Sequence, residues 1–109
     1  MAYKLLIVED EKEKATGIAY LTGKYNPECR PVLLAHDGRE GYEKAAAEQP
    51  DIIVTDIRMP EMDGLEMIRE LKKAGCSAEF IVLSGYAEFS YESNWESEIL
   101  SQNRLMRKN

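Results

Sequence analysis

The chain has 109 residues, of which 44% are hydrophobic and 31% charged, and its 14 basic and 20 acidic side chains give a formal net charge of −6. These values predict one small globular domain and exclude disorder, collagen-like repeats and a coiled coil as descriptions of the whole chain. Two cysteines and one histidine are too few for a disulfide scaffold, a structural zinc site or a histidine-based triad. The acidic balance, with scattered lysines and arginines, argues against direct nucleic-acid binding.

The N-terminal segment turns acidic almost at once. Residues 4–8 form a short continuous apolar run, typical of a strand buried on both faces, and Glu9, Asp10 and Glu11 follow directly. The run is too short for a signal peptide or a membrane span. We therefore expect a protein of the reducing cytoplasm that does not associate with membranes.

Further along the chain, apolar runs alternate with segments of helical periodicity. Asp37 is expected to cap one helix, and Gly75 to end another. The expected strands cover residues 4–8, 31–35, 51–55 and 79–83, and the expected helices include residues 15–22, 38–49, 64–74 and the segment from about residue 87. This alternation predicts an α/β fold, a doubly wound parallel sheet with right-handed crossovers and helices on both faces.

In such sheets, functional residues gather at the carboxyl ends of the strands. Here these ends carry Glu9 and Asp10 after the first strand, Asp56 after the third and Ser84 after the fourth. Crowded carboxylates repel one another unless a cation lies between them, and Mg²⁺ prefers one or two carboxylates, waters and a phosphate oxygen. Asp10 and Asp56 suit Mg²⁺, with Glu9 acting through water.

With a metal present, the acids at this edge suit phosphoryl chemistry. Asp56 would be a carboxylate nucleophile that forms an aspartyl-phosphate, and Ser84 would donate a hydrogen bond to the phosphoryl group. The alternative is that strand-end acids are solvated loop residues or helix caps, which is the commoner situation for any single acid.

Three sequence motifs lie at the ends of the predicted strands: LLIVEDE at residues 5–11, DIIVTDIRMPEMDGL at residues 51–65 and IVLSGY at residues 81–86. Together they resemble the receiver domain of two-component response regulators, over residues 3 to about 91. The run SGYAEFSY at residues 84–91 is similar to a Firmicute subgroup whose receivers usually precede an AraC-type DNA-binding module. The resemblance implies a flavodoxin-like sheet of order 2-1-3-4-5.

The resemblance also implies roles for individual residues. Asp56 would be the phosphoacceptor, phosphorylated by a sensor histidine kinase, and Ser84 the switch hydroxyl. Glu9 and Asp10 would be the acidic pair for Mg²⁺, joined by Asp56 and the main-chain carbonyl of Arg58. The resulting function is a phosphorelay domain that regulates a downstream, transcriptional response and catalyses nothing beyond its own phosphorylation and dephosphorylation.

The resemblance breaks down after about residue 91. A complete receiver continues with Gly-Ala-x-Asp-Tyr-Leu-x-Lys-Pro, and no such run follows here. We therefore expect an incomplete receiver over residues 1–91, with strand five and helix five missing or replaced, and an atypical tail, helical in one interpretation, over residues 92–109. Without strand five, residues 80–83 would lie on an open apolar edge that favours low stability or self-association.

Two hypotheses account for the tail. Read from the third nucleotide of each codon, the Asn94/Trp95 junction must encode Leu, and the next junction Gly. Later junctions allow the family's Lys-Pro at the family's spacing, so the tail would be an out-of-frame translation of an ordinary receiver end. Alternatively the tail is divergent, and Trp95, Ile99 and Met106 form the apolar face of a covering helix.

Two other functions remain open at this stage. In the first, the chain is a receiver fragment that no longer switches and acts only by binding, or a decayed gene product. In the second, it is a Mg²⁺-dependent phosphohydrolase. That chemistry needs a second acid as general acid two residues after the nucleophile, and Arg58 stands at that position.

Overall fold

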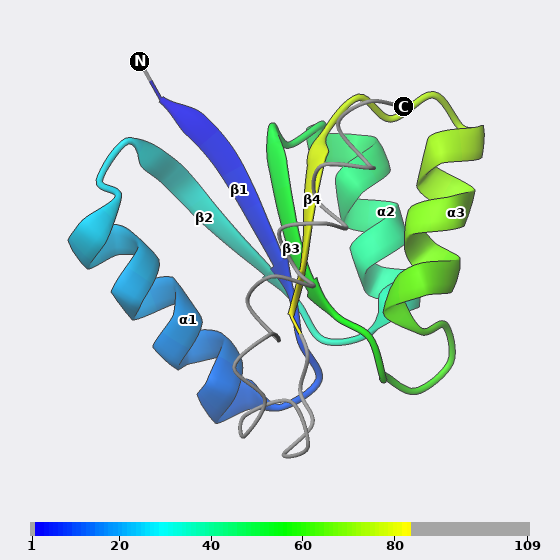
Figure 1. The fold of residues 1–109 in the computed structure, drawn as a ribbon, viewed down its shortest axis with the longest axis horizontal. Coiled ribbons are helices and arrows are strands. Elements are labelled where there is room, and N and C mark those ends of the chain that lie inside the picture. The colour runs from blue at the N-terminus through cyan, green and yellow to red at the C-terminus, as the bar shows by residue number, and fades with distance from the viewer. Residues whose placement is uncertain (1, 84–109) are drawn as a thin grey trace, which may run out of the picture.

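The computed structural model describes residues 2–83, which form a parallel sheet between two helical layers (Figure 1). The strand order β2-β1-β3-β4 confirms the predicted α/β receiver topology. The elements, in chain order, are β1 (Tyr3–Val8), α1 (Lys12–Tyr25), β2 (Cys29–Ala35), α2 (Gly38–Glu48), β3 (Ile52–Asp56), α3 (Gly64–Lys73) and β4 (Glu79–Leu83). The predictions for a helical segment from about residue 87 and for the tail over residues 92–109 lie outside the described residues.

The central strand is β1, which pairs in parallel with β2 on one side and with β3 on the other. Leu6 lies opposite both Leu33 of β2 and Ile53 of β3. Because both faces of β1 are covered, Leu6, Ile7 and Val8 are fully buried, which explains the continuous apolar run in the sequence.

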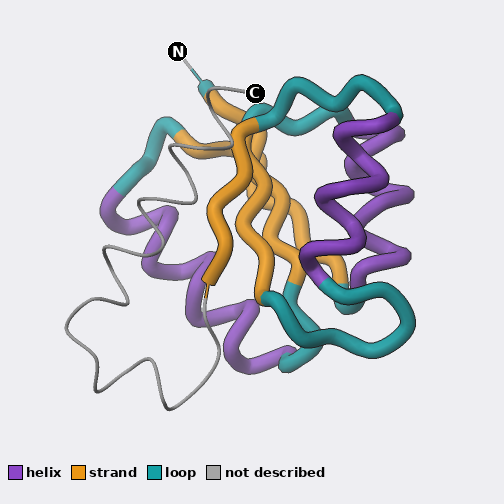
Figure 2. The backbone as a smooth tube through the Cα atoms, turned by 45° about the vertical axis from the view of Figure 1, so that its right-hand side comes forward, coloured by secondary structure: helices purple, strands orange, loops and turns teal. Residues whose placement is uncertain are grey.

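The helices lie on opposite faces of the sheet, with α1 on one side and α2 and α3 on the other (Figure 2). Side chains alternate along β1, so Leu6 and Val8 point to α2 and α3, whereas Leu5 and Ile7 point to α1. No helix in residues 2–83 is long and apolar enough to span a membrane.

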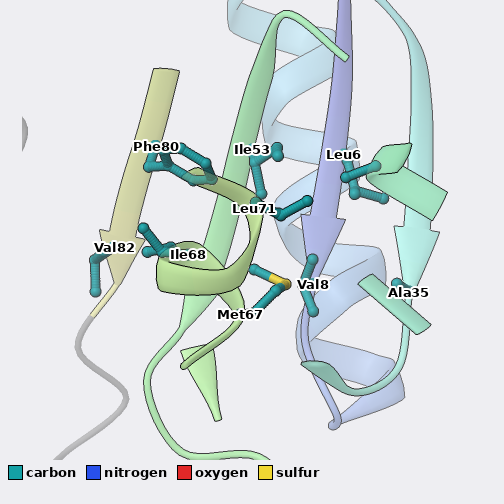
Figure 3. Packing of buried hydrophobic residues seen from close by; sticks show 10 residues of the cluster. Leu6, Val8, Ala35, Ile53, Met67, Ile68, Leu71, Phe80 and Val82 are labelled. Carbon is teal, nitrogen blue, oxygen red and sulfur yellow. The ribbon is translucent and has the colours of Figure 1, made fainter. Parts of the chain in front are cut away.

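The face covered by α2 and α3 holds the larger hydrophobic core (Figure 3). Met67 and Leu71 of α3 pack there against Val8 and Ile53, and Phe80 closes the core from β4. Helix α2 approaches closely because Gly41 has no side chain: a Cβ there would lie 2.9 Å from Val8 and 2.7 Å from the sulfur of Met67.

The local signals at the helix ends were partly visible in the sequence. As predicted, Asp37 caps α2 by accepting a 2.7 Å hydrogen bond from the Glu40 N–H, and Gly75 follows α3 at a φ of 89°. The reciprocal capping box of α3, formed by Asp63 and Glu66, was not among the predicted helix signals. Strand β2 begins two residues earlier than predicted, because Cys29 already pairs with Tyr3.

Candidate functional site

The acidic residues predicted to lie together come from two adjacent strands. Val8 of β1 pairs with Thr55 of β3, so Glu9 and Asp56, the next residue along each strand, emerge side by side at the carboxyl edge of the sheet. Both are buried, Glu9 at 1% exposure and Asp56 at 8%. Burying two carboxylates side by side costs free energy unless other groups compensate their charges.

The backbone around Asp56 is held tightly. The Ile57 N–H donates to Asp56 Oδ1 at 2.7 Å, and the Thr55 hydroxyl donates to the Asp56 carbonyl oxygen at 2.8 Å. The first residue of α3, Gly64, donates its N–H to the Ile57 carbonyl oxygen at 2.7 Å. A Cβ on Gly64 would lie 2.0 Å from the Asp56 carbonyl oxygen, so only glycine permits this approach.

Glu9 is the more deeply buried of the two acids, and its hydrogen bonding within residues 2–83 is incomplete. Its Oε2 accepts the Glu11 N–H at 3.1 Å, whereas its buried Oε1 has no hydrogen-bond partner among the described residues. Burial raises the pKa of Glu9 from 4.5 to about 7, and the Asp56 charge adds to this effect, while the Glu11 N–H and Lys14 oppose it. Glu9 therefore favours any cation that can lie beside it.

Lys14, in the first turn of α1, supplies one such positive charge. Its Nζ lies 3.1 Å from Asp56 Oδ2 and 3.5 Å from Glu9 Oε1. Burial alone lowers the pKa of Lys14, but the hydrogen bond and charge of Asp56, with Glu9, offset this and leave the pKa raised. Lys14 was not among the predicted site residues; the available signal was a basic residue one helical turn after the acidic run.

The remaining predicted site residues border the same edge. Asp10 is exposed, and its side chain contacts Glu9 closely enough to raise the Glu9 pKa further. Asp10 and Arg58 line a shallow depression of about 440 Å³ together with residues of the loop before α3. The structure thus brings Glu9 and Asp56 into one cluster with Asp10 at its rim, while Ser84 lies outside the described residues.

The donor set of this cluster fits a hard divalent cation. Within residues 2–83, no three histidine, cysteine or carboxylate side chains are grouped so as to hold a metal ion by themselves. Mg²⁺ does not need such a cage, because it usually binds one or two carboxylates and completes its shell with waters and a substrate phosphate. The buried Glu9 Oε1, which accepts no hydrogen bond within the described residues and lies 3.5 Å from Lys14 Nζ, is an oxygen of the kind that Mg²⁺ or its bound water requires.

A doubly wound parallel sheet with buried carboxylates at its carboxyl edge places the chain in the class of doubly wound α/β proteins. Sequence comparison identifies the family within that class. The model of the response regulator receiver domain family matches residues 5–96. The chain belongs to this receiver domain family.

Similar proteins agree with this assignment. The uncharacterized transcriptional regulatory protein YesN of Bacillus subtilis is 40% identical over 89 residues, which cover 82% of this chain and 24% of YesN. The alkaline phosphatase synthesis transcriptional regulatory protein PhoP of the same organism is 32% identical over 88 residues, covering 81% of this chain and 35% of PhoP. The chain thus spans only about a quarter to a third of the length of these relatives.

Solved structures show the same fold. The N-terminal domain of the WS1339 protein of Wolinella succinogenes superposes with a TM-score of 0.70 at 31% identity, covering 97% of both chains. A two-component transcriptional regulator AraC of Clostridium phytofermentans superposes with a TM-score of 0.69 at 28% identity, covering 94% of this chain and 91% of that one.

Proposed function

We propose that this receiver domain accepts a phosphoryl group on Asp56 from a sensor histidine kinase in a Mg²⁺-dependent reaction. The observation that carries the proposal is the position of the Asp56 carboxylate at the end of β3, beside a second buried carboxylate. Its Oδ1 accepts a hydrogen bond from the Ile57 N–H, which leaves Oδ2 as the oxygen that contacts the Lys14 ammonium group. A carboxylate held in this way is suited to nucleophilic attack on phosphorus.

Glu9, Asp10, Asp56 and the main-chain carbonyl of Arg58 are the proposed ligands for Mg²⁺. When bound, Mg²⁺ would neutralise the charge on the phosphoryl oxygens and the acids around them. Burial of Glu9 keeps its carboxylate where water competes poorly, so this side chain would hold either the metal or one of its waters. Asp10, at the exposed rim, would be the ligand that solvent reaches.

Asp56 then forms the bond to phosphorus as the bond from phosphorus to the donor nitrogen breaks, and the leaving group keeps the electron pair. The Ile57 N–H fixes the carboxylate so that the attacking oxygen does not rotate away. Ser84 is proposed to donate a hydrogen bond to the phosphoryl group. We propose no other substrate for the chain.

The output that we propose is regulation of transcription in the cytoplasm, because relatives such as YesN and PhoP are transcriptional regulatory proteins. The negative charge added at Asp56 would shift the equilibrium between two conformations of a nearby segment. The chain itself is not proposed to bind DNA. Within residues 2–83, β4 is the terminal strand of the sheet, and self-association through this edge remains a prediction.

Intact-mass measurement after incubation with Mg²⁺ and acetyl phosphate tests the proposal. We expect a phosphoryl adduct on the wild type and none on Asp56→Asn. Glu43→Gln is the matched control, since it removes one charge from a side chain that is 67% exposed, on the outer surface of α2, and it should take up the adduct like the wild type. Circular dichroism on the same samples verifies folding.

The other outcomes separate the alternatives. A folded wild type that takes up no adduct would contradict phosphorylation and favour a domain that acts only by binding its kinase. An unfolded wild type would favour a decayed gene product.

A further inference from the structure

The position of Lys14 does not stabilise the helix to which it belongs. It lies in the first turn of α1, which begins at Lys12, and a positive charge there opposes the helix dipole. Its side chain nevertheless reaches to the sheet edge and is only 33% exposed. The compensating interactions are those with the two buried carboxylates, so the acidic cluster determines where the ammonium group lies.

The two oxygens of the Asp56 carboxylate are not equivalent. Oδ1 accepts the Ile57 N–H at 2.7 Å and is held by the backbone. Oδ2 accepts from the Lys14 ammonium at 3.1 Å and has a partner that can move. Oδ2 is therefore the oxygen that is available for bond formation, and Lys14 already lies against it.

We propose that Lys14 is the residue that binds the phosphoryl group once it is attached to Asp56 Oδ2. This inference rests on the proposed phosphorylation of Asp56. As the oxygen–phosphorus bond forms and the donor's bond to phosphorus breaks, the negative charge of Oδ2 passes to the phosphoryl oxygens. The ammonium group follows that charge and redirects its hydrogen bond from Oδ2 to a phosphoryl oxygen, and no proton is transferred.

The geometry around the ammonium group permits both interactions at once. A lysine ammonium has three N–H donors on a flexible stem, so it can keep its ion pair with Glu9 Oε1, at 3.5 Å, while it contacts the phosphoryl group. Hydrogen bonds between charged groups are about twice as strong as neutral ones. Glu9 is therefore a positioning residue for Lys14 as well as a proposed metal ligand.

The test compares Lys14→Met with Lys12→Met, which removes the same charge from the same turn of α1 at an exposed position. With saturating Mg²⁺ and acetyl phosphate, we expect adduct formation on Lys14→Met to slow by about tenfold to a hundredfold. Lys12→Met should match the wild type. Lys14→Arg restores a cation at this position and should recover most of the rate.

A second measurement does not depend on turnover. Fluoroberyllate, a tetrahedral mimic of a phosphoryl group on a carboxylate, should raise the midpoint of thermal unfolding of the wild type and of Lys12→Met by the same amount. The rise should be much smaller for Lys14→Met, and Lys14→Gln provides a second neutral variant if the methionine variant does not fold.

The outcomes distinguish this inference from the proposed function. If the wild type forms an adduct and Lys14→Met forms it equally fast or faster, Lys14 only blocks the acidic cluster, and its phosphoryl-binding role is wrong. If a folded wild type forms no adduct, both the inference and the proposed phosphorylation are wrong.

Discussion

The two faces of the sheet differ in how completely they are packed. On the side of α2 and α3, ten hydrophobic side chains are buried in one cluster, whereas on the side of α1 the buried cluster contains only Leu5, Ile7 and Val54 among the described residues. Helix α1 also exposes Tyr20 and Tyr25.

The α1 face of the sheet also carries a groove of about 620 Å³. This groove lies between the end of α1 and strands β3 and β4. Within residues 2–83, the helix that contributes Lys14 to the acidic cluster is thus the one packed on the smaller buried cluster. Segments that must respond to a ligand are generally drawn from the less stable parts of a fold. Of the hydrophobic side chains buried within residues 2–83, most lie on the face of α2 and α3, and we expect that face to contribute more of the stability.

Gly64→Ala should have the largest effect, because it forces a Cβ against the Asp56 carbonyl oxygen on the tightly packed side. We expect the free energy of unfolding to fall by about 3–4 kcal/mol. In α1, by contrast, a Cβ on Gly23 would meet no atom within 4 Å, and Gly23→Ala should stabilise by about 0.5–1 kcal/mol. Urea unfolding of both variants measures this, and equal effects would contradict the comparison.

Leu71→Ala and Ile18→Ala test the two cores directly. Leu71 is 2% exposed in the larger cluster, and its truncation should cost about 2–3 kcal/mol through lost burial and the cavity left behind. Ile18 of α1 is only partly buried, so Ile18→Ala should cost about 1 kcal/mol. Denaturant midpoints with unchanged slopes would verify the difference, whereas a larger cost at Ile18 would reverse the order of the faces.

Glu9→Gln probes the functional edge where the two faces meet. The substitution removes a buried carboxylate whose pKa is raised to about 7, chiefly by desolvation, so the protein without Mg²⁺ should be stabilised by about 1 kcal/mol. The same variant should bind Mg²⁺ more weakly, which a Mg²⁺ titration of thermal unfolding would detect. Glu43→Gln, on an exposed side chain, should change neither property, and a loss of stability in Glu9→Gln would argue against this account.

The smallest effect is expected from Glu40, near the start of α2. The His36 N–H donates to its carboxylate at 2.7 Å and lowers its pKa below 4.5. A lowered pKa means that this stabilisation is present above pH 4.5 and lost as the pH falls through the folded-state value.

Because the Glu40 side chain is 34% exposed, solvent screening limits its contribution to about 0.5 kcal/mol. The difference in stability between wild type and Glu40→Gln, measured from pH about 6 to about 3, should shrink toward acid. A stability difference that stays constant with pH would show that the ionised Glu40 carboxylate does not cause it.

Much of the fold could be predicted because its signals are local. A continuous apolar run such as residues 4–8 indicates a doubly covered strand, and Asp37 and Gly75 mark helix ends within a few residues of the groups they interact with. The capping box of α3 was also local, as Asp63 and Glu66 are three residues apart, yet it was overlooked among the motif residues around it.

The sequence by itself determined the alternation of strands and helices and, through its motifs, the receiver family and the presence of Glu9, Asp10 and Asp56 at strand ends. Only the tertiary structure decided that Glu9 is buried, with one oxygen that accepts no hydrogen bond from residues 2–83, and that Lys14 lies 3.1 Å from Asp56, 42 residues further along the chain. The physical reason is that periodicity and caps reflect neighbours within a few residues. Desolvation and ion pairing depend on which distant segments the parallel crossovers bring to one edge.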